Sequence, residues 1–201
     1  MGRVSDLLEQ PHINMRKITS TDLNAIRITW TKMIGEDEFE SAYGRVFEGI
    51  EADLEKFGFN VPVHAFIYDP AALEDNKLVV DALVELTDTR AGKMTKALTV
   101  RLSPEYVNWD ADETLKKKVI GVYANVFTHL MTLGSVRAGE ESHNVKIYAR
   151  TNAMLDMLNE ISDGWGEIAK SLSSVDTQAK MEGRWINISF TPIEPPATKE
   201  I

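Results

Sequence analysis

Three segments of the chain have the apolar pattern of β-strands, and they follow one another with no helical period between them. They are residues 61–68, 77–86 and 94–102. In the second segment every other residue from Leu78 to Leu86 is apolar, which is the period of a strand with one buried face. Consecutive strands joined by short connections pair antiparallel. This part of the chain therefore predicts an antiparallel sheet.

Helical periods precede and follow these three segments. Apolar residues recur at helical spacing over 23–33 and over 39–57. We expect Gly35 and the acidic run at 36–38 to separate two helices and Gly58 to end the second. The remaining expected elements are a strand over 13–18, a helix opened by 110–113 and ending at Gly134, a strand over 145–149, a helix from Thr151, and a final strand over 180–190.

A strand–helix–strand unit that follows three antiparallel strands requires a crossover, and crossovers join parallel strands. The sequence therefore predicts one α/β domain with a mixed sheet, antiparallel early and parallel late, flanked by helices on both faces. Its 201 residues suit a single domain. We expect an N-terminal arm over 1–12, the domain over 13–190, and a proline-containing tail over 191–201.

Composition narrows the classes of partner. With 22 basic and 31 acidic residues the chain carries a formal charge of −9, which disfavours binding to nucleic acid or anionic lipid through bulk charge. It has no cysteine, which excludes disulfides, thiolate metal ligands and a cysteine nucleophile. The histidines lack metal-ligand spacing, and the apolar stretches are short. We expect no metal, no membrane span and a cytoplasmic location.

Three local patterns occur in an order that resembles one known family. They are an opening strand with Arg16 and the Asp22-Leu23 pair, the stretch from Leu98 to Tyr106 with its Pro-Glu-Tyr, and the stretch from Lys146 to Asn152. Together they resemble the GNAT family of acyl-CoA-dependent N-acyltransferases over roughly residues 13–190. The resemblance implies a GNAT-like mixed sheet. In an active member it would also imply that Val100, Leu102 and Ser103 hold the pantetheine of acetyl-CoA, with Asn152 beside it.

The loop that binds the pyrophosphate in that family departs from its pattern here. The family uses a basic, glycine-rich stretch because backbone N–H groups must approach the phosphates closely. Residues 103–113 instead contain four acids and neither glycine, Lys nor Arg; the lysines at 116–118 could offset them only by bending back. A carboxylate cluster at the start of the helix would repel a diphosphate. We therefore expect no cofactor.

The chemistry expected of an active member is also incomplete. The resemblance implies a tyrosine about seven residues after Asn152 as general acid, but Asn159 stands there, and Tyr148 lies in a strand. Glu85 and Asp81 are candidates for a general base, and neither spacing is diagnostic. The catalytic residues are therefore unknown, and whether the chain is an enzyme stays open.

Two functions follow from these observations. The first is a non-catalytic protein-interaction or assembly component, with a protein partner or a second copy of the chain. GNAT-like folds with an incomplete acyl-CoA loop also occur among virion-associated proteins of tailed bacteriophages, so the resemblance admits a virion location as well. The alternative is an N-acyltransferase that uses acetyl-CoA or a longer acyl-CoA on an amine.

The interaction candidates lie in the acidic loop. They are Trp109, Asp110, Asp112 and Glu113. Trp109 is either a packing plug or an anchor that faces a partner. Asp110 and Glu113 have the spacing of a capping box, so the acids either cap the following helix or exclude anions from it.

Overall fold

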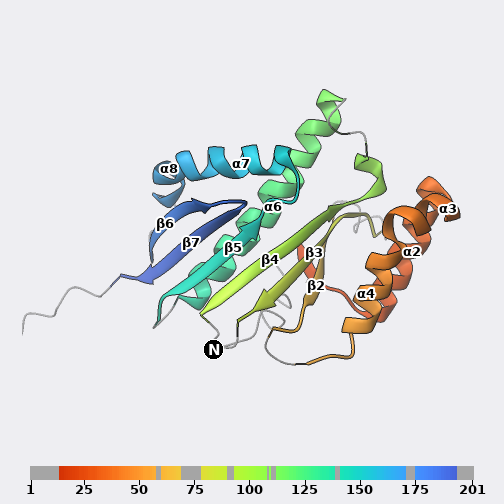
Figure 1. The fold of residues 1–201 in the computed structure, drawn as a ribbon, viewed down its shortest axis with the longest axis horizontal. Helices are drawn as coiled ribbons and strands as arrows, with labels where there is room; N and C mark the ends of the chain where they lie inside the picture. The colour runs from red at the N-terminus through yellow and green to blue at the C-terminus, as the bar shows by residue number, and fades with distance from the viewer. Residues whose placement is uncertain are drawn as a thin grey trace, which may run out of the picture.

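The computed structural model describes residues 14–57, 60–68, 78–89, 93–107, 109, 112–138, 141–170 and 175–193. Its centre is a seven-stranded sheet in the order β1-β2-β3-β4-β5-β7-β6 (Figure 1). The strands are β1 (Met15–Lys17), β2 (Val63–Tyr68), β3 (Val80–Asp88), β4 (Met94–Leu102), β5 (His143–Tyr148), β6 (Val175–Glu182) and β7 (Trp185–Pro192). Neighbouring strands are antiparallel except β4 and β5, which are parallel. The predicted mixed sheet is confirmed, but its late part is not parallel as expected. β5 and β7 pair antiparallel, because the chain forms β6 before β7 and so reverses direction once more, and the parallel pair is β4 and β5.

Helical segments fill the connections. They are α2 (Ser20–Ile34), α3 (Glu36–Phe39), a π-helical turn η1 (Glu40–Gly44), α4 (Arg45–Asp53), a 3₁₀ turn η2 (Pro104–Tyr106), α6 (Glu113–Arg137), α7 (Asn152–Asp163) and α8 (Trp165–Ala169). The helix expected over 23–33 is α2, which begins three residues earlier, at Ser20. The cap of α2 is Thr19, whose side chain accepts from the backbone N–H of Asp22 while the Asp22 carboxylate accepts from that of Thr19.

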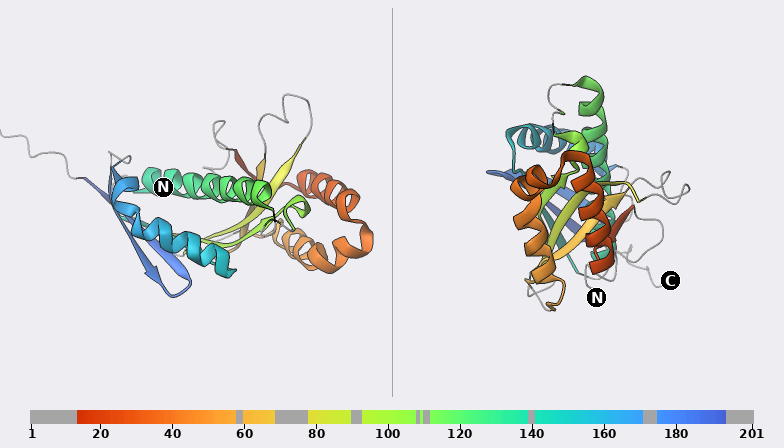
Figure 2. Two further views of the ribbon diagram at one scale, coloured as in Figure 1. Left: turned by 90° about the horizontal axis from the view of Figure 1, so that it is seen from above. Right: turned by 90° about the vertical axis from the view of Figure 1, so that its right-hand side faces the viewer.

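The two faces of the sheet carry separate cores. On β2, Phe66 packs with the aromatic and aliphatic residues of α2, α3 and α4, whereas Ala65 and Ile67 belong to the core that contains α6, α7 and α8. Adjacent residues of a strand point to opposite faces, so helices cover both faces, as predicted. The α2–α4 group and the β6–β7 hairpin lie at opposite ends of the molecule (Figure 2).

The expected break between the first two helices at Gly35, which has φ 87°, is confirmed. The role expected of the acidic run at 36–38 is wrong. These residues form the first turn of α3, where carboxylates are stabilised by the partial positive charge of the helix start. The second helix ends at Asp53, so Phe57 is not in its apolar stripe and is 82% exposed. Gly58 and Ile13 lie outside the described residues.

The single final strand expected over 180–190 is also wrong. The chain forms two antiparallel strands there, β6 and β7, in which Glu182 pairs with Trp185. Gly183 has φ 64°, a left-handed conformation that glycine adopts without the steric cost of a Cβ atom, and it reverses the chain between them. β7 continues to Pro192, two residues past the expected end of the domain at 190.

α6 is the one helix among the described residues that is long and apolar enough to cross a membrane, judged by length and composition alone. The sequence did not predict such a helix, because the uninterrupted apolar stretches of the chain are short. α6 contacts β5, β2 and β7 and contributes buried residues from Val119 to Arg137 to the core. The central helix of a folded domain has the same length and composition.

Candidate functional site

The parallel strands β4 and β5 pair along only part of their length. Their register runs from Met94 opposite Asn144 to Ala97 opposite Ile147, and β4 then continues to Leu102 without pairing to β5. A pocket of about 280 Å³ lies at this divergence. It is lined from β4 by residues 100–103, from η1 by Tyr43, from α6 by Tyr123, and from the segment after β5 by Arg150.

The order of the elements along the chain identifies the fold. A strand and two helical segments precede three antiparallel strands, and a helix then leads to a strand parallel to the last of them, followed by a further helix. This is the order that the sequence resemblance implied. The chain has a GNAT-like fold. The parallel pair with its divergent ends is the feature of that fold that shapes the candidate site.

Comparison with known proteins gives similar structures and no similar sequence. No family model matches the chain, and no curated protein matches it. A PaiA N-acetyltransferase of Thermoplasma acidophilum, solved with coenzyme A, is 15% identical with a TM-score of 0.32, over 89% of this chain and 98% of that one. A ribosomal-protein alanine N-acetyltransferase of Escherichia coli is 11% identical with a TM-score of 0.36, over 93% and 97%. A GNAT-family acetyltransferase of Staphylococcus aureus is 10% identical with a TM-score of 0.31, over 86% and 96%. At these values the likeness carries no inference about ligand or reaction.

The resemblance placed four residues beside the pantetheine. Three of them line the pocket where β4 and β5 diverge. Val100, Leu102 and Ser103 are all at the end of β4. Asn152 starts α7, as expected, but its side chain is exposed and accepts from Arg184 Nη1 at 3.2 Å. Its neighbour Thr151 lines the pocket instead.

Tyr43 covers part of the β4 edge. Its hydroxyl donates to the carbonyl oxygen of Leu102 at 3.2 Å, so a group that the resemblance offers to pantetheine already has a donor within the chain. Tyr43 belongs to the π-helical turn η1, and such turns often occur at functional sites. Burial raises the pKa of Tyr43, and the nearby Arg101 opposes that effect only in part. The hydroxyl therefore stays protonated and remains a donor.

Two arginines border the same pocket. Arg101 on β4 is half-buried, and burial lowers the pKa of Arg101, with the charge of Arg150 lowering it further. None of the ion pairs in the described part of the chain involves either residue. Sequence reasoning missed this local positive charge because Arg101 on β4 and Arg150, which follows β5, are far apart in the sequence and come together only through the pairing of these two strands.

The start of α6 is occupied by the chain's own carboxylate. Asp112 is the N-cap, and its Oδ1 accepts from the backbone N–H of Thr114 at 2.7 Å and of Leu115 at 3.2 Å. These N–H groups are the ones that a helix start offers to an anion. The expected cap with Asp110 is therefore wrong in position: Asp112 caps the helix, Glu113 is its first residue, and Asp110 lies outside the described residues.

The other described acids of this region repel a diphosphate less strongly than the sequence indicated, because two of them pair with lysines. Lys118 Nζ lies 3.4 Å from Glu105 Oε1, and Lys116 Nζ lies 3.5 Å from Glu113 Oε1. Lys116 therefore reaches back to the first residue of α6, and Lys118 reaches η2. Because these pairs are exposed, each is worth little. The group that opposes a diphosphate at α6 is thus Asp112 rather than the cluster as a whole.

Trp109 is half-buried and packs against the core that contains α6, and it also lines the pocket between β4 and β5. The structure therefore favours the packing interpretation of this residue. Asp112 and Glu113 are exposed. Val107, two residues before Trp109, is 56% exposed and also lines the pocket.

The candidates for acid–base chemistry do not meet in this pocket. Asp81 accepts from the Tyr106 hydroxyl at 2.8 Å, and Glu85 lines a different pocket beneath α4. Tyr148 stacks on Trp185 with ring centroids 5.0 Å apart, and Asn159 is exposed on α7. Among the described residues, no group of three His, Asp or Glu side chains is placed to hold a metal ion.

Proposed function

We propose that this protein is a GNAT-like binding component that does not hold acyl-CoA through α6 and acts through contacts with a protein partner or a second copy of itself. The observation that carries the proposal is the Asp112 carboxylate, which accepts from the N–H groups of Thr114 and Leu115. A diphosphate seated there would have to displace that carboxylate, and it would lose the hydrogen bonds of the cap and meet its charge. The residues present do not fit the pyrophosphate of coenzyme A.

Two further observations support the proposal. Tyr43 donates to the Leu102 carbonyl, which reduces the free hydrogen-bonding capacity of the β4 edge. Val107 lines the pocket beside that edge and is 56% exposed, and an exposed apolar side chain there suits a protein contact better than a phosphate contact.

An N-acyltransferase that uses acyl-CoA is the second candidate, and one observation favours it. β4 and β5 part after Ala97, and the pocket of about 280 Å³ at their ends is bordered by Arg101 and Arg150, whose charge would attract an anionic ligand. The arginines lie at the divergence and not at the start of α6. A ligand held by them would therefore be bound differently from a diphosphate at a helix N-terminus.

Titration calorimetry and thermal unfolding with acetyl-CoA distinguish the two functions. The proposal expects no heat of binding and no change in melting temperature at millimolar acetyl-CoA. A ligand at a hundred times its Kd would stabilise the fold by about 2.7 kcal/mol. Saturable binding by the unmodified chain would contradict the proposal and support the acyltransferase.

The variant Asp112→Ser tests the stated cause. Serine keeps a capping oxygen and removes the negative charge, so this variant should bind acetyl-CoA better than the unmodified chain if Asp112 is what excludes the diphosphate. Glu113→Ser is the matched control, because Glu113 is exposed and does not accept from the N–H groups of Thr114 or Leu115. Equal behaviour of the two variants would remove Asp112 as the cause.

A further inference from the structure

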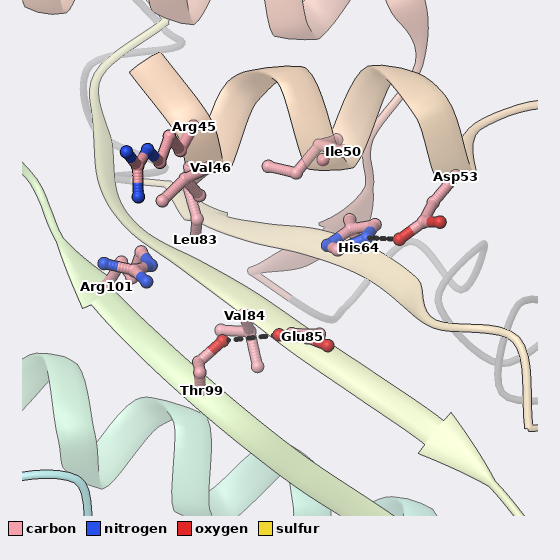
Figure 3. A pocket seen from close by; sticks show the side chains of 11 residues that line it. Arg45, Val46, Ile50, Asp53, His64, Leu83, Val84, Glu85, Thr99 and Arg101 are labelled. Atoms are coloured by element: carbon pink, nitrogen blue, oxygen red, sulfur yellow. Dashed lines mark hydrogen bonds and ion pairs between the residues drawn. The ribbon is translucent and has the colours of Figure 1, made fainter. Parts of the chain in front are cut away.

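A second pocket, of about 260 Å³, lies between α4 and the sheet face that carries the α2–α4 core (Figure 3). Its floor follows the strand register: His64 on β2 pairs with Glu85 on β3, and Glu85 pairs with Thr99 on β4. Three polar side chains therefore lie side by side on one face. The next row on that face begins with Phe66 and Leu83, which are core residues. Polar groups in an apolar layer are costly unless they are hydrogen-bonded, and within this row His64 bonds to Asp53 and Thr99 donates to Glu85.

Positive charge collects at one end of this pocket. The guanidinium groups of Arg45, from α4, and Arg101, from β4, lie at the same end (Figure 3). In the part of the chain that the structure describes, no ion pair involves Arg45 or Arg101. Arg45 is exposed and Arg101 half-buried, and a carboxylate or phosphate can accept from the paired N–H donors of arginine.

Negative charge lies further along the floor. Glu85 is half-buried, and its Oε2 accepts from the Thr99 hydroxyl at 3.0 Å. Its other oxygen, Oε1, accepts no hydrogen bond from the described residues. Asp53 is already engaged, since Lys56 Nζ lies 2.8 Å and His64 Nε2 lies 3.0 Å from its two oxygens. Glu85 is therefore the carboxylate with capacity left for a cationic group.

We propose that this pocket binds a small zwitterion of the α-amino-acid type. Its carboxylate lies against Arg45 and Arg101, and its ammonium group donates to Glu85. The volume is below the roughly 300–1,000 Å³ typical of pockets for drug-sized ligands, so the ligand is small. A dicarboxylate is disfavoured because its second charge would face Glu85, and a simple amine leaves the two arginines without an anion.

This site does not rest on the function proposed above, although Arg101 lines both this pocket and the pocket between β4 and β5. It is built from α4 and from the β2, β3 and β4 side chains that point toward α4, and it uses neither Asp112 nor the start of α6. Binding of acetyl-CoA would contradict the proposed function and leave this inference standing.

Gly49 supplies a variant that closes the pocket without harming the helix. It lines the pocket from α4, and a Cβ atom added there would meet nothing within 4 Å. Leucine has a higher helix propensity than glycine, so Gly49→Leu should fold at least as well as the unmodified chain. Its side chain would occupy the space proposed for the ligand.

The test is a titration of the full chain with the common α-amino acids, each used separately, followed by saturation-transfer NMR and calorimetry. We expect at least one of them to bind saturably. Its N-acetyl derivative, which lacks the ammonium charge, and its methyl ester, which lacks the carboxylate, should each bind roughly tenfold more weakly or worse. Arg45→Gln and Glu85→Gln should weaken binding by a similar factor, and Gly49→Leu should abolish it.

Lys32→Gln on α2 and Glu48→Gln on α4 are the charge-matched controls, because both sites are exposed and neither lines the pocket. Their affinity should equal that of the unmodified chain. The inference is overturned if none of the amino acids binds at millimolar concentration. It is overturned equally if the ester and the N-acetyl derivative bind as well as the parent, or if Gly49→Leu folds and still binds.

Discussion

Arg137 holds Asp88 through both of its terminal nitrogens: Nη1 donates to Oδ1 at 2.7 Å and Nη2 to Oδ2 at 3.0 Å. Thr95 donates to the same carboxylate at 2.9 Å and lies 3.0 Å from Nε2 of the fully buried His143. The four residues come from the end of α6, the end of β3 and the starts of β4 and β5. They join β4 to β5 where the two strands pair, at the opposite end from the pocket.

Replacing Arg137 with methionine should be strongly destabilising. The substitution keeps the volume of the side chain but leaves the carboxylate of Asp88, whose side chain is only 14% exposed, without its cation. Breaking such a buried pair costs about 3–5 kcal/mol. The measurement is urea unfolding of Arg137→Met.

Lys93→Met is the control for that experiment. Lys93 pairs with Glu141 at 3.2 Å, and both side chains are more than half exposed. Its loss should change the free energy of unfolding by less than about 1 kcal/mol. Similar costs for the two variants would show that the Arg137 pair does not stabilise the junction of β4 and β5.

Gly134 on α6 and Gly121 on the same helix should respond oppositely to alanine. A Cβ atom at Gly134 would come within 2.8 Å of the ring of Phe190, a core residue of β7, whereas one at Gly121 would meet nothing within 4 Å. Gly121→Ala should stabilise by about 0.5–1 kcal/mol through helix propensity. Gly134→Ala should destabilise by about 1–3 kcal/mol through overpacking. Thermal unfolding of both variants checks this, and a stabilised Gly134→Ala would refute the close contact between α6 and β7.

The cap at Asp112 should be visible in stability. Asp112→Ala removes the acceptor for two N–H groups and should cost about 1 kcal/mol, while Asp112→Ser should keep most of the stability. The free energy of unfolding from urea titrations measures both. An alanine variant as stable as the serine variant would mean that these N–H groups do not depend on the carboxylate.

Asp53 should make stability depend on acid pH. Hydrogen bonds from Lys56 and then from His64 lower the pKa of Asp53 below its ordinary value of 3.8. A carboxyl whose pKa is lower in the folded state stabilises the fold above the pKa of the unfolded state, and that contribution is lost as the pH falls through the folded pKa. Asp53→Asn should therefore be destabilising at about pH 7, and the difference should shrink below about pH 3.

The size of that effect is limited by exposure. The side chain of Lys56 is 57% exposed, so the loss at neutral pH should stay under about 1 kcal/mol. Asp156→Asn, at an exposed site on α7, is the control and should show no such change with pH. Unfolding in urea at the two pH values provides the comparison. A difference that grows toward acid pH would contradict a lowered pKa for Asp53.

The order of elements could be predicted because the apolar periods are strong where the elements are long. β4 runs over Met94–Leu102 as expected, and α6 follows its helical period three residues beyond Gly134. The errors in the predicted element boundaries arose where neighbouring residues give conflicting indications of secondary structure. Acids at 36–38 break an apolar period but favour a helix start, and a single glycine, Gly183, turns one expected strand into two.

The residues that line the two pockets were less predictable than the fold. They come from different strands, and the register of the strand pairs decides which of them lie side by side. Val100, Leu102 and Ser103 were implied by the family resemblance, and they line one pocket because they lie at and directly after the end of β4. The row of His64, Glu85 and Thr99 joins residues far apart in sequence, and the register that aligns them shifts between Glu85 and Leu86. Nor does the sequence show that Asp112, rather than Asp110, would cap α6.

The backbone amide signals of Thr114 and Leu115 in a ¹H–¹⁵N NMR titration with coenzyme A give the most direct test of the claim that the chain's own carboxylate fills the anion site of α6. We predict that neither signal moves as coenzyme A is added, because both amides remain bonded to Asp112. Saturable shifts of both signals, at concentrations that leave distant amides unchanged, would contradict that claim.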